Sequence, residues 1–224
     1  MAVLEWDKVG EREYETGVKK GVLYPYATND YGNGVAWNGL ISVSETPSGA
    51  EPNKLYADDT TYATLMSNEE FGGTIEAYMS PEEFDQCDGT TEIAKGVTIG
   101  QQERKAFGLC YRTILGNDTQ NENYGYKLHI VYGAKANPTE KQYSSVNDSP
   151  EAATLSWEFT TTPVAVKVEG KNYKPTSLII VNSTKADAAK LKQLEDILYG
   201  TESEEPRLPL PEEIVQIMGD VVAG

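Results

Sequence analysis

The chain has 224 residues, of which 39% are hydrophobic and 24% charged, so it can bury a substantial core and lacks the composition of a disordered protein. Its formal net charge is −16 at pH 7. That charge disfavours tight binding of nucleic acid, because such binding depends on Lys and Arg side chains that neutralise phosphates. No apolar run approaches the ~20 residues that a membrane-spanning helix needs, and residues 1–10 show no secretion signal. We therefore expect a soluble protein made in the cytoplasm.

The first quarter of the chain predicts one strand between irregular segments. Residues 1–21 are charged and punctuated by glycine, which predicts an arm that becomes ordered only against a partner. Residues 23–34 are rich in turn-forming residues. Residues 36–45 predict a strand that places Trp37, Ile41 and Val43 on one face.

The next segment predicts a long loop followed by two strands. Residues 46–53 contain two prolines and a glycine, which favours an extended and partly stiff loop. Leu55 to Met66 is rich in Tyr and Thr, and Thr74 to Met79 alternates between apolar and polar side chains, so both segments are predicted to be strands. The polar residues 67–73 between them predict a turn.

A short helix is expected directly after the second of these strands. Ser80 can cap the first turn, Pro81 suits the first helical position, and Glu83 completes a capping box. Phe84 and Cys87 lie three residues apart and give the helix one apolar face, and Gly89 ends it.

Strands dominate the centre of the chain. Residues 105–115 alternate, with Phe107, Leu109 and Tyr111 on one side and Arg112 on the other. Tyr126 to Tyr132 alternates too, with Leu128 and Ile130 facing inward and Lys127 and His129 outward. The remaining predicted strands are Leu155–Phe159, Val164–Val168 and Thr176–Asn182.

The pattern becomes helical after residue 183. Thr184 with Asp187 predicts a helix start, and Leu191, Leu194 and Leu198 recur at helical spacing up to Gly200. An acidic linker follows, and Pro211 begins a second helix. The sequence therefore predicts a mainly β protein, a sandwich or barrel, with residues 1–183 as the β domain and residues 184–224 as a helical extension.

Few residue patterns suggest chemistry. Asp58 and Asp59 follow Tyr56 and Ala57, and paired aspartates on a hairpin can hold magnesium in polymerases, but that chemistry needs a third carboxylate and a basic channel. His129 is the single histidine, and we expect a half-exposed strand residue without a nucleophile beside it. Cys87 and Cys110 cannot supply the four ligands of a zinc site even with His129, and their pairing stays open.

The chain resembles the major tail proteins, or tail tube proteins, of long non-contractile-tailed phages of Gram-positive bacteria. Three stretches carry this resemblance: GVLYPYATNDYGNG and the residues after it, within 21–89; RKAFGLCYRTILGNDTQ and the strands after it, within 104–163; and KLKQLEDILYG with its proline-containing continuation, within 190–214. Together they span most of the chain.

The resemblance implies a structural virion protein and no enzyme. It implies a β-sandwich with a flanking helix, and subunits that form hexameric rings, which stack into a tube. The expected partners are other copies of the chain, the tape-measure protein, and the tail terminator and distal tail proteins. DNA would pass through the lumen without specific binding, and no catalytic residue, cofactor, metal or membrane is implied. The acidic charge fits such a lumen, with Asp58 and Asp59 as candidates for lumen or ring-contact positions on a strand face.

Three alternatives remain open from the sequence. A tube subunit of a phage-tail-derived bacteriocin or of a secretion system would share the same mechanics without DNA. A carbohydrate-binding β-sandwich would use the 14 tyrosines and three tryptophans as a stacking surface. An enzyme would require a divalent metal.

Overall fold

A computed structural model describes residues 3–28, 30–145, 152–168 and 170–219. The protein is mainly β, with 47% of residues in strands and 13% in helices, and a large antiparallel sheet dominates it. The predicted fold class, a β-sandwich or barrel with a few short helices, is confirmed.

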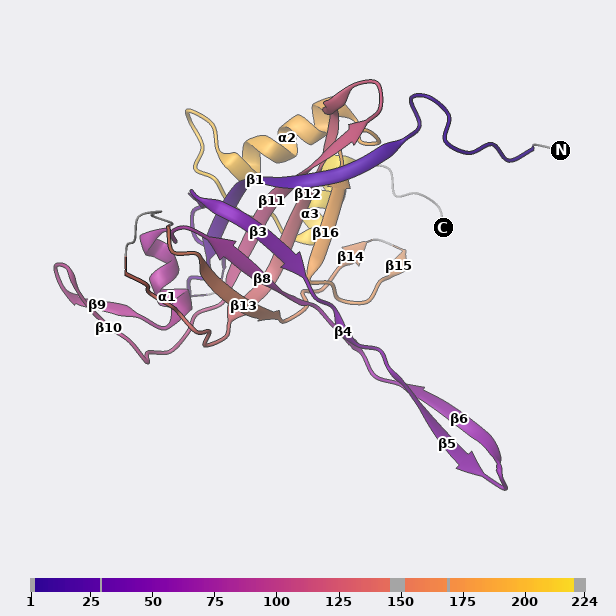
Figure 1. Ribbon diagram of the computed structural model, residues 1–224, viewed down its shortest axis with the longest axis horizontal. Coiled ribbons are helices and arrows are strands. Elements are labelled where there is room, and N and C mark those ends of the chain that lie inside the picture. The colour runs from indigo at the N-terminus through magenta and orange to yellow at the C-terminus, as the bar shows by residue number, and fades with distance from the viewer. Residues whose placement is uncertain (1–2, 29, 146–151, 169, 220–224) are drawn as a thin grey trace.

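The large sheet has eight strands. Seven follow the order β2-β1-β11-β12-β13-β8-β3, and β16 pairs with β12 beside this path. The strands are β1 (Glu13–Pro25), β2 (Val35–Ala36), β3 (Leu40–Glu45), β8 (Gly72–Ala77), β11 (Phe107–Asn117), β12 (Asn121–Ala136), β13 (Leu155–Thr161) and β16 (Leu178–Asn182). Figure 1 shows β3, β8 and β13 crossing in front of the β1–β11–β12 part of the sheet.

The long strand β12 allows the sheet to fold over on itself, because two different strands pair with its middle and its end. Its middle pairs with β16 through Lys127–Val131, whereas its end pairs with β13 through Ala134–Ala136. Gly133 lies between these two pairings with a φ of +60°, and a Cβ there would meet the Thr162 carbonyl oxygen at 2.2 Å. Only glycine fits this position, because both the backbone conformation and the close approach exclude a side chain.

Alternate side chains of the central strands enter two cores. Phe107, Leu109 and Tyr111 of β11 pack between the two layers of sheet with Trp37, Ile75, Phe84, Trp157 and Phe159. Cys110 faces the other side and packs with Leu128 and Ile130 of β12. The predicted alternation of β11 and the inward positions of Leu128 and Ile130 are therefore confirmed.

Two helices, α2 (Ala188–Tyr199) and α3 (Pro211–Met218), cover the second core. A 3-10 turn (Glu82–Phe84) and α1 (Asp85–Asp88) instead contribute Phe84 and Cys87 to the first core. Leu191, Leu194 and Leu198 of α2 pack against the sheet, as their spacing predicts. The change from strands to helices falls near residue 183 as expected, but the helical segment shares its core with the sheet.

The helix starts differ in part from prediction. Asp187 caps α2 by accepting hydrogen bonds from the amides of Ala189 and Lys190 at 2.9 and 3.0 Å, whereas Thr184 donates to Asn182 instead. The first turn after Pro81 has no side-chain cap, so the predicted Ser80 cap is wrong. Gly89, with a φ of 76°, ends α1 as predicted.

Two hairpins extend from the body (Figure 1). The longer one, here called the projecting hairpin (residues 46–71), contains β4 (Ser48–Gly49), β5 (Pro52–Ala57), β6 (Thr60–Met66) and β7 (Glu69–Glu70). The shorter one contains β9 (Thr91–Ala94) and β10 (Val97–Ile99). A small pair, β14 (Lys167–Val168) and β15 (Lys171–Asn172), lies near β16.

The projecting hairpin corrects three predictions. The single strand predicted for Leu55–Met66 is wrong, because the chain reverses at Asp58-Asp59, whose φ angles are 50° and 60°. Two successive residues with positive φ form the tight turn whose twist matches that of a two-stranded ribbon. The predicted loop 46–53 is largely paired in the stem of the hairpin, and the predicted turn 67–73 contains the paired β7 and the start of β8.

Further corrections concern the first 45 residues. The predicted arm 1–21 is shorter, because β1 begins at Glu13, and the segment expected to be turn-rich from residue 23 begins with buried Leu23 and Tyr24. The predicted strand 36–45 is interrupted before β3, and Ile41 is exposed beside an irregularity in register, so it does not share a face with buried Trp37.

The strand predicted for Val164–Val168 is reduced to a bridge at Val164 and the two residues of β14. Pro163 lies just before this segment and interrupts the strand ladder, as expected. The predicted strand Thr176–Asn182 is confirmed as β16, which begins two residues later.

Candidate assembly surface

The projecting hairpin is exposed along its whole length. Every residue of β5 and β6 is exposed except Ala63, which is half-buried. The two strands pair from Pro52 with Met66 to Ala57 with Thr60, with one irregularity beside Tyr62. The hydroxyl of Thr60 donates to the Ala57 carbonyl at 3.1 Å and helps to close the turn. The hairpin therefore has regular local structure but receives little cover from the body.

This hairpin carries large apolar side chains that its own fold cannot bury. A two-stranded hairpin has no second layer, and isolated hairpins are at best marginally stable in water. The exposed side chains are Leu55, Tyr56, Tyr62, Leu65 and Met66. Leu55 pairs with Ala63 and Asn53 with Leu65, so the two leucines lie on the same face of the ribbon. That face is suited to contact with another protein surface.

Two more segments have the same character. Residues 3–12 extend away from the body (Figure 1), with exposed Val3, Leu4, Trp6 and Val9. The amide of Gly10 donates to Asp118 at 2.9 Å and so fixes the end of this segment. The β9–β10 hairpin exposes Ile93, Val97 and Ile99. More than half of the exposed large hydrophobic side chains of the described residues thus belong to three projections.

The residues considered for metal chemistry do not form such a site. Asp58 and Asp59 occupy the turn of the projecting hairpin, not a strand face. Among the described residues, no group of three or more His, Cys, Asp or Glu side chains could hold a metal ion. Cys87 and Cys110 are free and belong to different cores, and burial raises the pKa of both thiols to about 12. Both side chains therefore stay protonated and behave as small apolar groups.

His129 lies in a buried polar cluster that the sequence did not predict. Its side chain is only 7% exposed, so the expected half-exposed position is wrong. The reason is that β12 lies between β11 and β16, and Glu45 at the end of β3 covers the face of β12 opposite to Leu128 and Ile130. Its ring stacks on Tyr111 with centroids 4.7 Å apart and planes at 11°. The Nδ1 atom lies 2.8 Å from Glu45, and Nε2 lies 3.1 Å from Thr113 and 3.6 Å from Glu15.

The two carboxylates of this cluster are held in the charged form. The hydrogen bond to His129 lowers the pKa of Glu45 against the effect of burial, and the Tyr111 hydroxyl, 2.6 Å away, lowers it further. Burial alone would raise the pKa of Glu15, but hydrogen bonds from Lys127 and Thr113 lower it below its ordinary value. The cluster links β1, β3, β11 and β12. The Thr113 hydroxyl lies beside His129, contrary to the expectation that no nucleophile would, but it donates to Glu15 and the cluster is buried, so its contacts point to a structural role.

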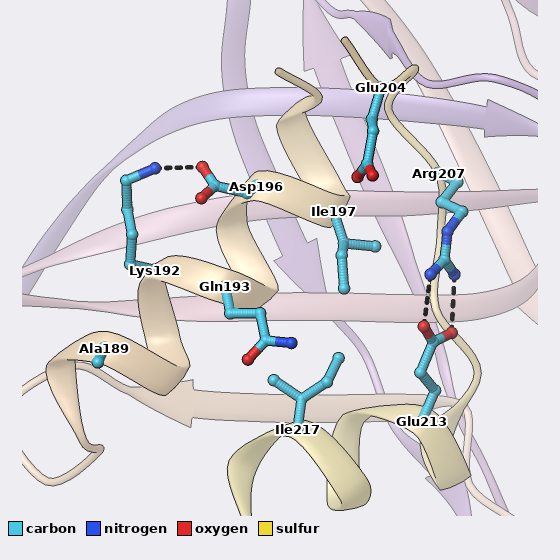
Figure 2. Close-up of a pocket in the computed structure, with 9 residues that line it drawn as sticks. All are labelled: Ala189, Lys192, Gln193, Asp196, Ile197, Glu204, Arg207, Glu213 and Ile217. Carbon is cyan, nitrogen blue, oxygen red and sulfur yellow. Dashed lines mark hydrogen bonds and ion pairs between the residues drawn. The ribbon is translucent and has the colours of Figure 1, made fainter. Parts of the chain in front are cut away.

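A shallow pocket of about 440 Å³ lies between α2, α3 and the linker that joins them. Figure 2 shows two pairs among its charged side chains: Arg207 binds Glu213 through two hydrogen bonds, and Lys192 binds Asp196 on the same helix. The hydrogen bond from Arg207 holds the pKa of Glu213 below its ordinary range. One pair lies within α2 and the other connects the linker to α3, so the pocket contributes to the packing of this segment and is a weaker candidate site than the projections.

Comparisons with known proteins leave the family undecided. No protein-family model matches the chain. No curated protein sequence matches it. In the described part of the chain, no helix combines the length and apolar character that a transmembrane helix requires. The functional conclusion therefore depends on the geometry of the exposed segments and on the sequence resemblance.

Proposed function

We propose that this chain is the repeating subunit of a self-assembling tube, the major tail tube protein of a phage with a long non-contractile tail. The observation that carries the proposal is the projecting hairpin, with exposed Leu55 and Leu65 on one face and no second layer of its own. Such a surface loses water-exposed apolar area only when another chain covers it. The resemblance to tail tube proteins supplies the expected partner, which is a second copy of the same subunit.

The body of the protein fits a repeating unit. Contacts made through a projection on one copy and a different surface on the next are heterologous, and such contacts generate rings or filaments when repeated. The resemblance favours hexameric rings that stack into a tube. Within a tail, the tube would surround the tape-measure protein and end at the terminator and distal tail proteins.

The acidic charge supports a conduit for DNA. The projecting hairpin carries Glu51, Asp58, Asp59, Glu69 and Glu70 against Lys54, and the whole chain has a net charge of −16. A tube that attracted phosphates would repeat the attraction at every ring and retain the DNA, whereas an acidic wall avoids ion pairs with it. This role needs no catalytic residue or cofactor.

Electron microscopy of concentrated full-length protein tests the proposal. We expect rings or tubes of uniform diameter, formed spontaneously or after addition of tail initiator proteins. The matched variant replaces residues 51–67 with a short Gly-Ser turn, because Ala50 and Asn68 already meet through a backbone hydrogen bond. This variant should fold as a monomer and form no tubes.

Several outcomes would contradict the proposal. Full-length protein that stays monomeric in light scattering at high concentration and under every seeding condition would do so. Specific binding of a glycan by that monomer would instead support the carbohydrate-binding alternative. Tubes that form equally well without the hairpin would show that this segment is not the assembly surface.

A further inference from the structure

The polar cluster around His129 lies at the base of the projecting hairpin. Glu45 is the last residue of β3, and the chain continues from it directly into residues 46–71 (Figure 1). Glu45 contacts His129 of β12 and Tyr111 of β11 through side chains. The cluster therefore connects the strand that leads into the hairpin to the opposite layer of the sandwich.

Both ring nitrogens of His129 face acceptors. The Glu45 Oε1 atom, 2.8 Å from Nδ1, is a carboxylate oxygen that also accepts from the Tyr111 hydroxyl, so Nδ1 must donate. Thr113 gives its one hydroxyl proton to Glu15, at 2.5 Å, so its oxygen can only accept from Nε2, at 3.1 Å. Lys127 also donates to Glu15, which keeps that carboxylate ionised. This arrangement is complete only when both ring nitrogens carry protons.

We propose that doubly protonated His129 clamps β3, and with it the base of the projecting hairpin, to the β1–β11–β12 layer, and that loss of one ring proton loosens this clamp. A neutral imidazole has a single N–H, so either Glu45 or the Thr113–Glu15 side loses its donor. If Nδ1 keeps its proton, Thr113 must turn toward Nε2 and leave Glu15 with Lys127 alone. That turn replaces a charge-assisted hydrogen bond with a neutral one, whereas loss of the Nδ1 proton removes the hydrogen bond between His129 and Glu45 altogether.

The titratable and charged groups that face His129 come from each packed strand. They are Glu15 on β1, Glu45 on β3, Tyr111 on β11 and Lys127 on β12. Burial raises the pKa of Tyr111 and the hydrogen bond to Glu45 raises it further, so its hydroxyl remains a donor. Glu15 and Glu45 have lowered pKa values and stay ionised near neutral pH. Tyr111, Glu15 and Glu45 therefore keep one charge state near neutral pH, and the geometry leaves the ring protons of His129 as the variable of the cluster.

The proposed clamp lies within one subunit and does not require assembly, so its test uses the soluble full-length monomer. His129 is the single histidine, and its ring gives one set of NMR signals that report its protonation directly. Below the titration midpoint of these signals we expect two ring N–H groups, and above it one. Mass spectrometry then measures hydrogen exchange of residues 42–50 and 11–17 at one pH on each side of that midpoint.

His129→Gln provides the comparison, because its amide can donate one hydrogen bond but does not titrate. Comparing exchange with wild type at the same pH cancels the intrinsic pH dependence of exchange. Below the midpoint, wild type should exchange roughly tenfold more slowly than the variant, as expected for loss of a hydrogen bond to a charged group. Above the midpoint, the ratio of the exchange rate of the variant to that of wild type should fall to about threefold or less. Glu158→Gln, at an exposed position on β13, is the control and should match wild type at both pH values.

Two results would overturn the clamp. One is a His129 ring that carries a single N–H at every pH at which the protein is folded. The other is a ratio of exchange rates that is the same below and above the midpoint. If His129→Gln does not fold, Glu45→Gln takes its place, and the same ratios of its exchange rate to that of wild type are expected. A ratio for Glu45→Gln that is the same below and above the midpoint would likewise overturn the clamp. Neither result depends on whether tubes form.

Discussion

Arg112 of β11 and Glu195 of α2 form an ion pair with an N–O distance of 2.5 Å in the contact between sheet and helix. The guanidinium lies 4.2 Å from the centre of the Tyr126 ring and donates to the Tyr199 hydroxyl at 2.9 Å. Both charged side chains are mostly covered, with 12% and 15% exposed. Each charge therefore depends on the other, because a covered and unpaired charge is costly.

Removing one partner of this pair should be destabilising. We expect Glu195→Ala to lower the free energy of unfolding by about 2–3 kcal/mol, since it leaves Arg112 covered without its carboxylate and deprives Tyr126 of its acceptor. Urea denaturation followed by circular dichroism measures the change. Glu202→Ala, in the exposed linker, should stay within about 0.5 kcal/mol of wild type. Equal effects of the two substitutions would contradict the role of the pair.

The lowered pKa of Glu45 predicts a specific dependence of stability on acid. A carboxyl group whose pKa is lower in the folded state stabilises the fold above its unfolded pKa, here close to the ordinary 4.5, and this contribution is lost as pH falls through the folded pKa. Wild type should therefore be more stable than Glu45→Gln at pH 7, and the difference should shrink at pH 3. Urea midpoints at both pH values measure it. A difference that is unchanged at pH 3 would refute the assignment.

Gly73 is expected to tolerate no side chain. A Cβ there would lie 2.2 Å from the Ser44 carbonyl oxygen and 2.8 Å from the Phe159 ring, between β3 and β13. Gly73→Ala should cost about 2–3 kcal/mol, because strand backbone and core must both move. Gly100→Ala is the matched control, since a Cβ at that position meets nothing within 4 Å. Thermal melts of both variants check this, and similar melting temperatures would contradict the packing argument.

One face of the projecting hairpin should matter for assembly. Leu65 lies on the face of Leu55, whereas Thr64 pairs with Lys54 and points to the opposite face. Leu65→Asp should abolish tubes while changing monomer stability by less than about 0.5 kcal/mol, because the side chain is already exposed. Thr64→Asp adds the same charge on the other face and should assemble better than Leu65→Asp. Light scattering and electron microscopy provide the readout, and the reverse order would show that the other face makes the contact.

Local patterns determined much of the fold by themselves. The alternation of Phe107, Leu109 and Tyr111 predicted the inward face of β11, because side chains of a strand point to opposite sides in turn. The spacing of Leu191, Leu194 and Leu198 predicted the buried face of α2. Pro211 marked the start of α3, and Gly89 the end of α1, because their backbone preferences act locally.

Tertiary structure decided the features on which the proposed function depends. Leu55–Met66 has strand-forming residues throughout, and only the pairing of β5 with β6 shows that Asp58-Asp59 turns the chain. Burial of His129 depends on β3 and β16, which come from distant parts of the sequence, so a count of alternating residues in β12 could not predict it. Propensity and periodicity report on neighbours along the chain, whereas a projecting surface and a buried polar cluster are set by which segments cover a strand in space.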